Sequence, residues 1–276
     1  MNYDIYLDLV QQEKYTEAIE YKISCIPDVL YKYCWLDEET TDEAKEANDL
    51  RLSTLAKGQI YLSTLDQFND PFEGKAFTFD GEDSARSGFT VEQFQEFVDH
   101  INAHSRVCCF SNADEKQQNM PMWAYYANNH RGFCVEYRLQ PNQKKFIFPV
   151  SYDGTRVNGN ALMLHLISGI IQMVKDGKDS SQMSGELSVH NHLAYLSLTC
   201  KHASWKHEKE YRALVPAVMG KYFDLEPQKI YVGMKCSEDH EKRLAEIARS
   251  FSGCEIYKMQ QANNGLEFKL VELQLT

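Results

Sequence analysis

The chain has 276 residues, of which 43% are hydrophobic and 25% charged, and 29 basic residues against 40 acidic ones give a net charge of −11. This length lies near the upper limit for one hydrophobic core, so we expect one domain with a small appendage. The acidic balance disfavours broad electrostatic binding to nucleic acid or anionic membranes, while leaving room for a local basic pocket.

The sequence contains no segment that predicts a membrane span, a secretory signal or a disulfide-rich protein. No apolar run reaches the roughly 18 residues that a membrane span needs. Residues 1–14 lack the basic and apolar regions of a secretory signal. The eight cysteines are scattered and form no CxxC pair, which is typical of reduced thiols and predicts no structural zinc site. We therefore expect a cytoplasmic protein.

The chain begins with two segments whose apolar residues recur at helical spacing, Tyr3–Gln11 and Tyr15–Ser24, and Pro27 ends the pair. We expect a helical lead-in over residues 1–27, followed by a single α+β domain over residues 28–276.

Strand-like and helix-like segments then follow in irregular order. The expected strands are Val29–Trp35, Gln59–Ser63, Arg106–Ser111, Gly132–Tyr137, Phe146–Tyr152, Tyr211–Val215 and Lys229–Val232, with a hairpin over Glu255–Leu275 that turns at Asn263-Asn264-Gly265. The expected helices are Leu50–Lys57, Thr90–Ala103, Met122–Asn128, Ala161–Val174, His190–Cys200 and Glu238–Phe251.

Four segments carry further expectations. Thr90 and Gln93 predict a capping box, and Ala161–Val174 is apolar enough for a buried core helix. The acidic run Asp37–Asn48 is typical of a solvated loop or an exposed helix, and Asp176–Glu186 of a polar loop. Because helices do not alternate evenly with strands, we expect a mixed, largely antiparallel sheet flanked by helices.

Common catalytic motifs are missing from the sequence, including GxGxxG, the Walker loop, GxSxG and HExxH. The closest grouping of histidines, His190, His192, His202 and His207, matches no usual ligand spacing. We therefore expect no metal site.

The segment Trp205–Arg212 is the most informative one. If a strand begins near Glu208, then the side chains of Glu208, Glu210 and Arg212 share one of its faces. This pattern fits a surface ladder of ion pairs, which contributes little stability. It fits equally a catalytic carboxylate whose partner sets its ionisation.

Two further segments place polar residues beside aromatic ones. Asn69 and Asp70 stand between two phenylalanines, either to cap a turn or to serve a site. In Met122–Gly132, Trp123 and Tyr126 share a helical face, with Tyr125 pointing elsewhere. We expect Trp123 to pack in the core, and Tyr126, His130 and Arg131 to reach a cleft at the end of the helix.

Five segments in order resemble the pattern of a large, mostly bacterial family of uncharacterised domains, over about residues 29–235. They are Leu30–Tyr33, Phe68–Glu73, Cys109–Ser111, Met122–Gly132 and Trp205–Arg212. That family carries no assigned reaction.

The chain is also similar, more weakly, to ADP-ribosyltransferases. The similarity lies in an early strand with a cation, a middle strand ending in Ser and a late Glu-x-Glu, which here are Lys32, Ser111 and Glu208–Glu210. In those enzymes the first motif holds NAD, the second shapes the nicotinamide pocket and the last Glu is catalytic. Lys32 stands where Arg or His is usual, and Ser111 lies outside a full Ser-Thr-Ser run.

This second resemblance implies an ADP-ribosyltransferase-like fold, with NAD as the substrate and Glu210 and Glu208 as the catalytic pair. The expected ligand-binding residues are Tyr31, Lys32, Tyr33, Asn69, Asp70, Ser111, Tyr126, His130 and Arg212. The expected function is an NAD-using ADP-ribosyltransferase or NAD glycohydrolase in a bacterial defence or toxin setting, acting on a protein or nucleic-acid acceptor. The alternatives are a non-catalytic module that binds a nucleotide or a protein and, less favoured by the acidic charge, a metal-dependent nuclease.

Overall fold

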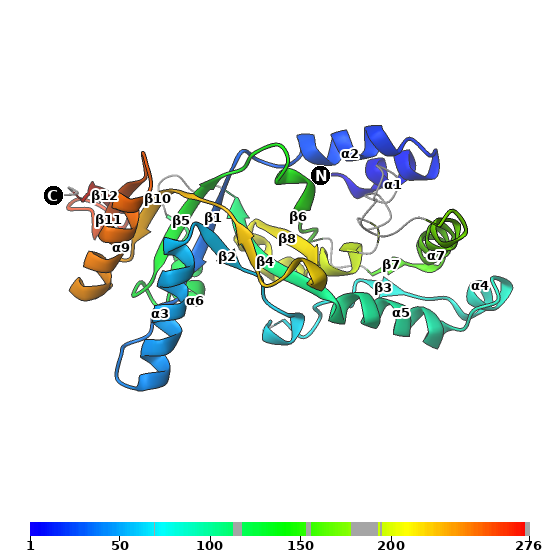
Figure 1. The fold of residues 1–276 in the computed structure, drawn as a ribbon, viewed down its shortest axis with the longest axis horizontal. Coiled ribbons are helices and arrows are strands. Elements are labelled where there is room, and N and C mark those ends of the chain that lie inside the picture. Colours follow the sequence, from blue (N-terminus) through cyan, green and yellow to red (C-terminus); the bar gives the residue numbers. More distant parts are fainter. Residues whose placement is uncertain (69, 113–117, 153–155, 178–192, 194, 274–276) are drawn as a thin grey trace.

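The computed structural model describes residues 1–68, 70–112, 118–152, 156–177, 193 and 195–273, and one large β-sheet runs through its centre (Figure 1). The strand order is β12 (Phe268–Glu272), β11 (Glu255–Gln261), β10 (Pro227–Val232), β5 (Phe133–Arg138), β1 (Val29–Cys34), β4 (Ser105–Asn112), β8 (Glu210–Pro216) and β6 (Ile147–Pro149). Among these neighbours β10 and β11 run parallel and the other pairs antiparallel. The expected α+β class and mixed, largely antiparallel sheet are confirmed.

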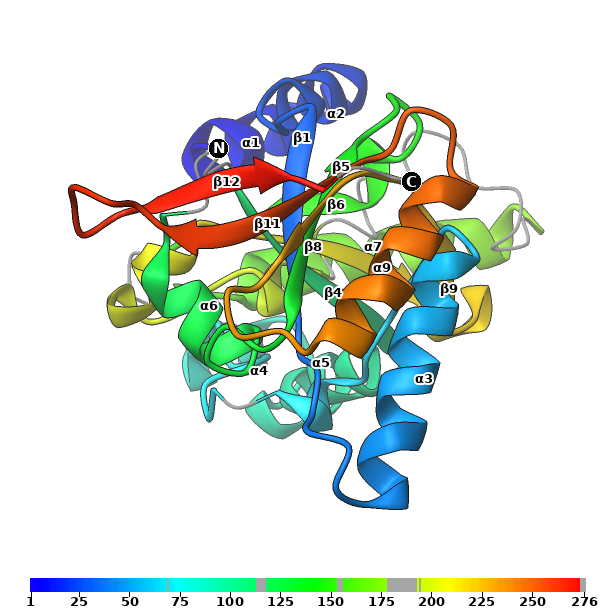
Figure 2. The same cartoon turned by 90° about the vertical axis from the view of Figure 1, so that its left-hand side faces the viewer.

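Alternating side chains give the sheet two different faces. Leu30 of β1 lies in the main core, with Leu52 of α3 (Asp42–Ala56) and Leu244 of α9 (Glu238–Ser250). These two helices lie side by side on that face (Figure 2). The next residue, Tyr31, points to the opposite face and packs there with Trp123 of α6 (Met120–Tyr126). This two-residue period is the one expected of a strand covered on both faces.

A second core lies beyond β6, at the other end of the molecule (Figure 1). It is formed by α1 (Tyr3–Gln11), α2 (Tyr15–Ser24), α5 (Val91–Ala103), α7 (Asn160–Lys175) and β3 (Phe77–Thr78). Lys22 of α2 is fully buried, and its amine donates hydrogen bonds to the carbonyls of Lys144 and Lys145 at 3.3 and 2.5 Å. The Tyr3 hydroxyl donates to the Pro149 carbonyl at 2.6 Å. These bonds attach the lead-in to the 3₁₀ helix η2 (Lys144–Phe146) and to the edge strand β6.

Short elements complete the described chain. They are α4 (Gly81–Arg86), β2 (Gln59–Tyr61) paired with β9 (Tyr222–Asp224), β7 (Val157–Asn158) paired with β3, and the 3₁₀ helices η1 (Leu65–Gln67), η2 (Lys144–Phe146), η4 (Leu196–Leu198), η5 (Ala203–Glu208) and η6 (Ala217–Met219). No helix in the described ranges is long and apolar enough to cross a membrane.

The lead-in helices have the predicted bounds, and Thr90 and Gln93 form the predicted capping box. The helix predicted over Leu50–Lys57 is too short, because Thr41 caps α3 and much of the acidic run is helical. The strand predicted over Phe146–Tyr152 is reduced to β6, since η2 occupies the residues before it.

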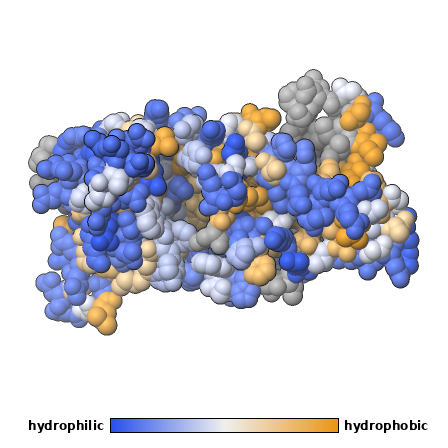
Figure 3. Space-filling view, turned by 90° about the horizontal axis from the view of Figure 1, so that it is seen from below, coloured by the Kyte–Doolittle hydropathy of each residue, from blue (hydrophilic) through white to orange (hydrophobic). Residues whose placement is uncertain are grey.

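The prediction of a buried core helix holds for part of α7. Met163 and Leu166 are buried, whereas Ile171 and Val174 are 48% and 73% exposed. Hydrophobic residues reach the surface at the end of the molecule that holds α4, α5 and α7 (Figure 3). Most of the predicted loop over residues 176–186 lies outside the described residues. Of the predicted helix over residues 190–200, residues 190–192 and 194 lie outside them, and the described part contains the short 3₁₀ helix η4.

Candidate functional site

A cavity opens where β1 and β4 separate. Leu30 pairs with Asn112 and Tyr31 with Ser111, and beyond these two pairs the strands diverge. β1 continues along β5, and β4 continues along β8. The gap is a cavity of about 360 Å³, which we call the fork cavity. Its volume is within the range of small-molecule sites.

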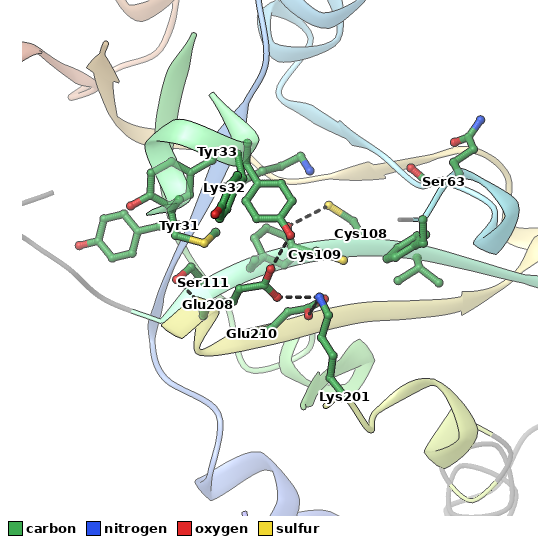
Figure 4. Close-up of a pocket in the computed structure, with 17 residues that line it drawn as sticks. Tyr31, Lys32, Tyr33, Ser63, Cys108, Cys109, Ser111, Lys201, Glu208 and Glu210 are labelled. Carbon is green, nitrogen blue, oxygen red and sulfur yellow. Dashed lines mark hydrogen bonds and ion pairs between the residues drawn. The ribbon is translucent and has the colours of Figure 1, made fainter. Parts of the chain in front are cut away.

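The walls of the fork cavity come from distant parts of the chain (Figure 4). They are formed by residues 31–33 of β1, residues 107–111 of β4, Ser63, Gln67 and Phe68 around η1, Met122, Tyr125 and Tyr126 of α6, and Lys201, Glu208 and Glu210.

Two carboxylates converge on one lysine at the cavity wall. The Lys201 amine lies 2.6 Å from Glu208 Oε2 and 3.0 Å from Glu210 Oε2 (Figure 4). The Tyr126 hydroxyl donates to Glu208 Oε1. The Lys201 amine also lies over the Trp205 ring, 5.0 Å from its centroid. Both oxygens of Glu208 are thus held by side chains from different segments.

Arg212 supports Glu210 from behind the cavity. Its Nε donates to Glu210 Oε1 at 2.7 Å, and its Nη1 and Nη2 donate to the two oxygens of Glu73 at 2.6 and 2.7 Å. The Leu198 carbonyl accepts a further bond from Nη1 at 2.5 Å. Because this guanidinium is fully buried, its fork geometry fixes the orientation of both carboxylates.

The charges in this buried network do not cancel. Its members are Glu73, Lys201, Glu208, Glu210 and Arg212, and each side chain is at most 5% exposed. Three carboxylates face two cations, so the fully ionised network has one excess negative charge. In a low-dielectric setting such a charge either takes up a proton or attracts a positively charged ligand.

The pKa values of the two cavity acids are shifted in opposite directions. Burial raises the pKa of the Glu208 carboxyl, and this outweighs the lowering by its bonds to Lys201 and Tyr126. Burial also acts to raise the pKa of Glu210, but Arg212 and Lys201 outweigh it and lower this pKa to about 2. Glu210 therefore stays ionised while Glu208 can exchange a proton, a division typical of acid–base pairs.

The backbone bends between these two acids. Glu208 ends η5, Lys209 has left-handed angles of φ 45° and ψ 50°, and β8 begins at Glu210. Ser111 stabilises the bend, because its hydroxyl donates to the Glu208 carbonyl at 2.6 Å. β8 thus begins one residue before the predicted strand Tyr211–Val215, and not near Glu208, the start that would have placed the three side chains on one strand face. The three predicted side chains still meet, because the bend brings Glu208 beside Glu210.

Lys32 lines the cavity from the β1 side. It is half-buried and forms no ion pair with any described carboxylate, unlike Lys201 and Arg212. Burial works to lower the pKa of its amine, but the neighbouring Cys108 and Cys34 sulfurs outweigh this effect and raise it. With no ion-pair partner among the described carboxylates, this amine can contact an anionic ligand that enters the cavity.

Most of the predicted ligand-binding residues do line the fork cavity, namely Tyr31, Lys32, Tyr33, Ser111 and Tyr126. Tyr31 also donates to the buried Glu136 at 3.1 Å. Arg212 lies behind the wall and acts on it through Glu210.

Other predicted residues lie elsewhere. Asp70 is buried and accepts a bond from the Phe72 amide at 2.9 Å, as in an Asx turn, and Asn69 is outside the described residues. His130 does not line the cavity, because it stacks on Trp123 with ring centroids 5.9 Å apart. Trp123 is fully buried, as predicted.

Glycine at position 132, in the motif around α6, has a backbone role. A Cβ atom there would lie 2.0 Å from the Cys34 carbonyl oxygen, so another residue would push β5 away from β1. This close approach keeps the β1 edge of the cavity in place.

Three contributors were not among the predicted site residues. Lys201 stands outside regular structure and has no sequence pattern that marks it. Glu73 closes the Phe68–Glu73 motif, and its place in that motif was the signal that could have identified it. Tyr125 was expected to point elsewhere, but it lines the cavity beside Tyr126.

Part of this site matches the model of a known family. Residues 122–213 match the model of a family described as a protein of unknown function, DUF2971. This confirms the expected resemblance to an uncharacterised domain family over about a third of the chain, from α6 into β8. No curated protein and no solved structure matches the chain.

The side chains that line the fork cavity are of several chemical types. Within the described ranges no three His, Cys, Asp or Glu side chains are grouped as metal ligands. All eight cysteines lie in the described part of the chain and are thiols. The cavity offers two acids, aromatic rings and the amines of Lys32 and Lys201.

Proposed function

We propose that the fork cavity binds a nucleotide through its ribose and breaks the N-glycosidic bond, with NAD as the candidate substrate. The reaction would be ADP-ribosyl transfer or NAD hydrolysis. The observation that carries the proposal is the pair Glu208 and Glu210, buried in one cavity with pKa values shifted in opposite directions.

The negative charge of the carboxylate network favours the step in which the N-glycosidic bond breaks. As the bond from ribose C1′ to the nicotinamide nitrogen breaks, its electron pair goes to the nicotinamide, and positive charge builds on the sugar, as in glycoside hydrolysis. Glu210, ionised and held by Lys201 and Arg212, would stabilise this charge without reorganisation. The excess negative charge of the network would also stabilise the positive charge on the sugar.

The second half of the reaction assigns a role to Glu208. An incoming hydroxyl, from water or from an acceptor, forms the new bond to C1′ and gives up its proton. Glu208 would accept that proton, because its raised pKa makes it the more basic of the two acids. Tyr126 and Lys201 would hold its carboxylate in place.

The strand order gives independent support for NAD. Lys32, Ser111 and Glu210 lie on β1, β4 and β8, which are adjacent, and Ser111 pairs with both Tyr31 and Glu210. This is the motif order of the ADP-ribosyltransferase resemblance, now with its three residues around one cavity. Lys32 would meet the diphosphate, although an amine is a less pre-organised partner for it than a guanidinium.

One observation favours a different function, a non-catalytic nucleotide-binding module. The carboxylate oxygens of both acids already have protein partners, namely Tyr126, Lys201 and Arg212. Carboxylates whose oxygens are all bonded to protein groups can form a rigid cavity wall. Such a wall can bind a ligand and release it without chemical change.

Nicotinamide release from NAD by the purified protein tests the proposal. We expect release by the wild type, and losses of at least about a hundredfold in Glu210→Gln and Glu208→Gln. Glu246→Gln, at an exposed position of α9, is the matched control and should keep full activity. Circular dichroism would check that each variant is folded. NAD bound and returned unchanged would favour the binding module, and neither release nor binding would refute the NAD assignment.

A further inference from the structure

A second cavity, of about 350 Å³, lies next to the fork cavity. Lys32 and Gln67 line both. The remaining walls come mainly from α3, β2 and β5. Lys32 thus stands at the boundary between two separate compartments.

The second cavity has the chemistry of a site for a flat ring. Its aliphatic wall is formed by Ala47, Leu50, Leu55 and Ile60, and its aromatic wall by Tyr61, Phe133 and Tyr137. Leu50 is 54% exposed, so this wall is open to an incoming ligand. Apolar walls with a few polar groups are typical of sites that hold an aromatic base.

Polar groups are present at defined points of this cavity. Arg51 lines it and is held by Asp37, with Nη1 3.1 Å from Oδ2, and by Asn48 at 3.2 Å. Its orientation is therefore fixed before a ligand arrives. Thr54 and Gln59 add a hydroxyl and an amide to the same cavity.

We propose that the second cavity binds the base and ribose of the distal half of a dinucleotide, whose reacting half occupies the fork cavity. The anionic linkage between the halves lies at Lys32, which lines both cavities and forms no ion pair with a described carboxylate. This inference rests on the proposed function and adds to it the selection of a dinucleotide over a mononucleotide. Each cavity is close to the lower limit of about 300 Å³ for ligand sites, and together they suit the larger molecule.

The test fills the second cavity and leaves the fork cavity intact. Ala47→Trp places an indole in the second cavity, and Ala44→Trp, one turn earlier on α3 and outside the lining, is the matched control. Nicotinamide release is measured with NAD and with nicotinamide mononucleotide, which lacks the distal half. Binding of AMP, which represents that half, is measured by calorimetry.

In Ala47→Trp we expect the KM for NAD to rise by about tenfold or more, the effect of losing one stacked base. Turnover of the mononucleotide should be unchanged, AMP binding should be lost, and Ala44→Trp should behave as the wild type. Equal NAD kinetics in all three proteins, or AMP binding that survives in Ala47→Trp, would overturn the inference while leaving the proposed function intact. If neither substrate is cleaved, the proposed reaction fails, and selective loss of AMP binding would still support the second cavity.

Discussion

Replacing Arg212 by methionine removes a guanidinium that no solvent reaches and that holds two carboxylates at once. Methionine fills much of the same volume, so the main effect is electrostatic. Glu73 and Glu210 would remain buried and lose their strongest partner, and the Leu198 carbonyl would lose a donor.

The size of the effect follows from this arrangement. Breaking a buried ion pair by removing one partner costs about 3–5 kcal/mol. Arg212 serves two acids, so we expect a loss near the upper value, about 5 kcal/mol. In the double variant Arg212→Met/Glu73→Gln one buried charge is gone as well, and the second change should recover about 1–3 kcal/mol through coupling within the network.

Urea unfolding followed by circular dichroism measures these free energies, with equal slopes showing that the unfolded states are comparable. Arg131→Met is the control, because the Arg131–Glu38 pair is exposed and should contribute less than about 1 kcal/mol. A loss below about 1 kcal/mol in Arg212→Met, or strict additivity with Glu73→Gln, would refute the account of a coupled buried network.

Other predictions concern the same site. The pKa of Glu210, about 2 in the fold against an ordinary 4.5, means that its ionised form stabilises the protein above about pH 4.5 and that this contribution is lost as the pH falls toward 2. The free energy of unfolding should therefore fall less steeply with decreasing pH in Glu210→Gln than in the wild type. Identical curves would contradict the lowered pKa of Glu210. The pKa of Glu208 is raised, so its ionised form is the less stable one in the fold. Glu208→Gln should therefore be more stable than the wild type at pH 7 while losing activity, and a less stable variant would argue against a desolvated acid. In Tyr126→Phe the loss of the bond that lowers the Glu208 pKa should move the acidic limb of the rate profile to higher pH, and an unmoved limb would exclude Glu208 as the base. Lys32→Met should weaken NAD binding by about tenfold or more with little change in stability, as measured by calorimetry and thermal unfolding; unchanged affinity would exclude a phosphate contact.

Much of the fold could be predicted from local signals. The lead-in helices, the capping box at Thr90 and the C-terminal hairpin depend on residues close in sequence, and their positions were predicted correctly. The start of α3 was left open between a solvated loop and an exposed helix, because Asp42–Asn48 is polar and lacks the apolar period that marks a packed helix. The segment is helical in the structure, where Thr41 caps the helix and the helix packs against α9.

The sequence identified several residues of the site by their types, but it did not predict the backbone geometry that brings them together. Glu208, Glu210 and Arg212 stood out because acids and an arginine recur beside Trp205. The bend at Lys209 was not predictable, since a left-handed lysine depends on bonds that Ser111 and Asn112 supply from another strand. Lys201 was missed although Glu208 and Glu210 follow it by only 7 and 9 positions, because it lies outside any helix or strand and no periodic pattern predicts which way its side chain points.

The contacts that build the fork cavity join residues far apart in the chain. Glu73 and Arg212 are 139 positions apart, Ser111 and Glu208 are 97 apart, and Tyr126 and Glu208 are 82 apart. Contacts of such long range close large loops and form slowly compared with helices and hairpins. During refolding, helical signal should therefore return before the ability to bind ligand, and a chain caught part-way would contain most of its helices and no working cavity. Recovery of ligand binding would therefore indicate that the network has formed and that folding is complete.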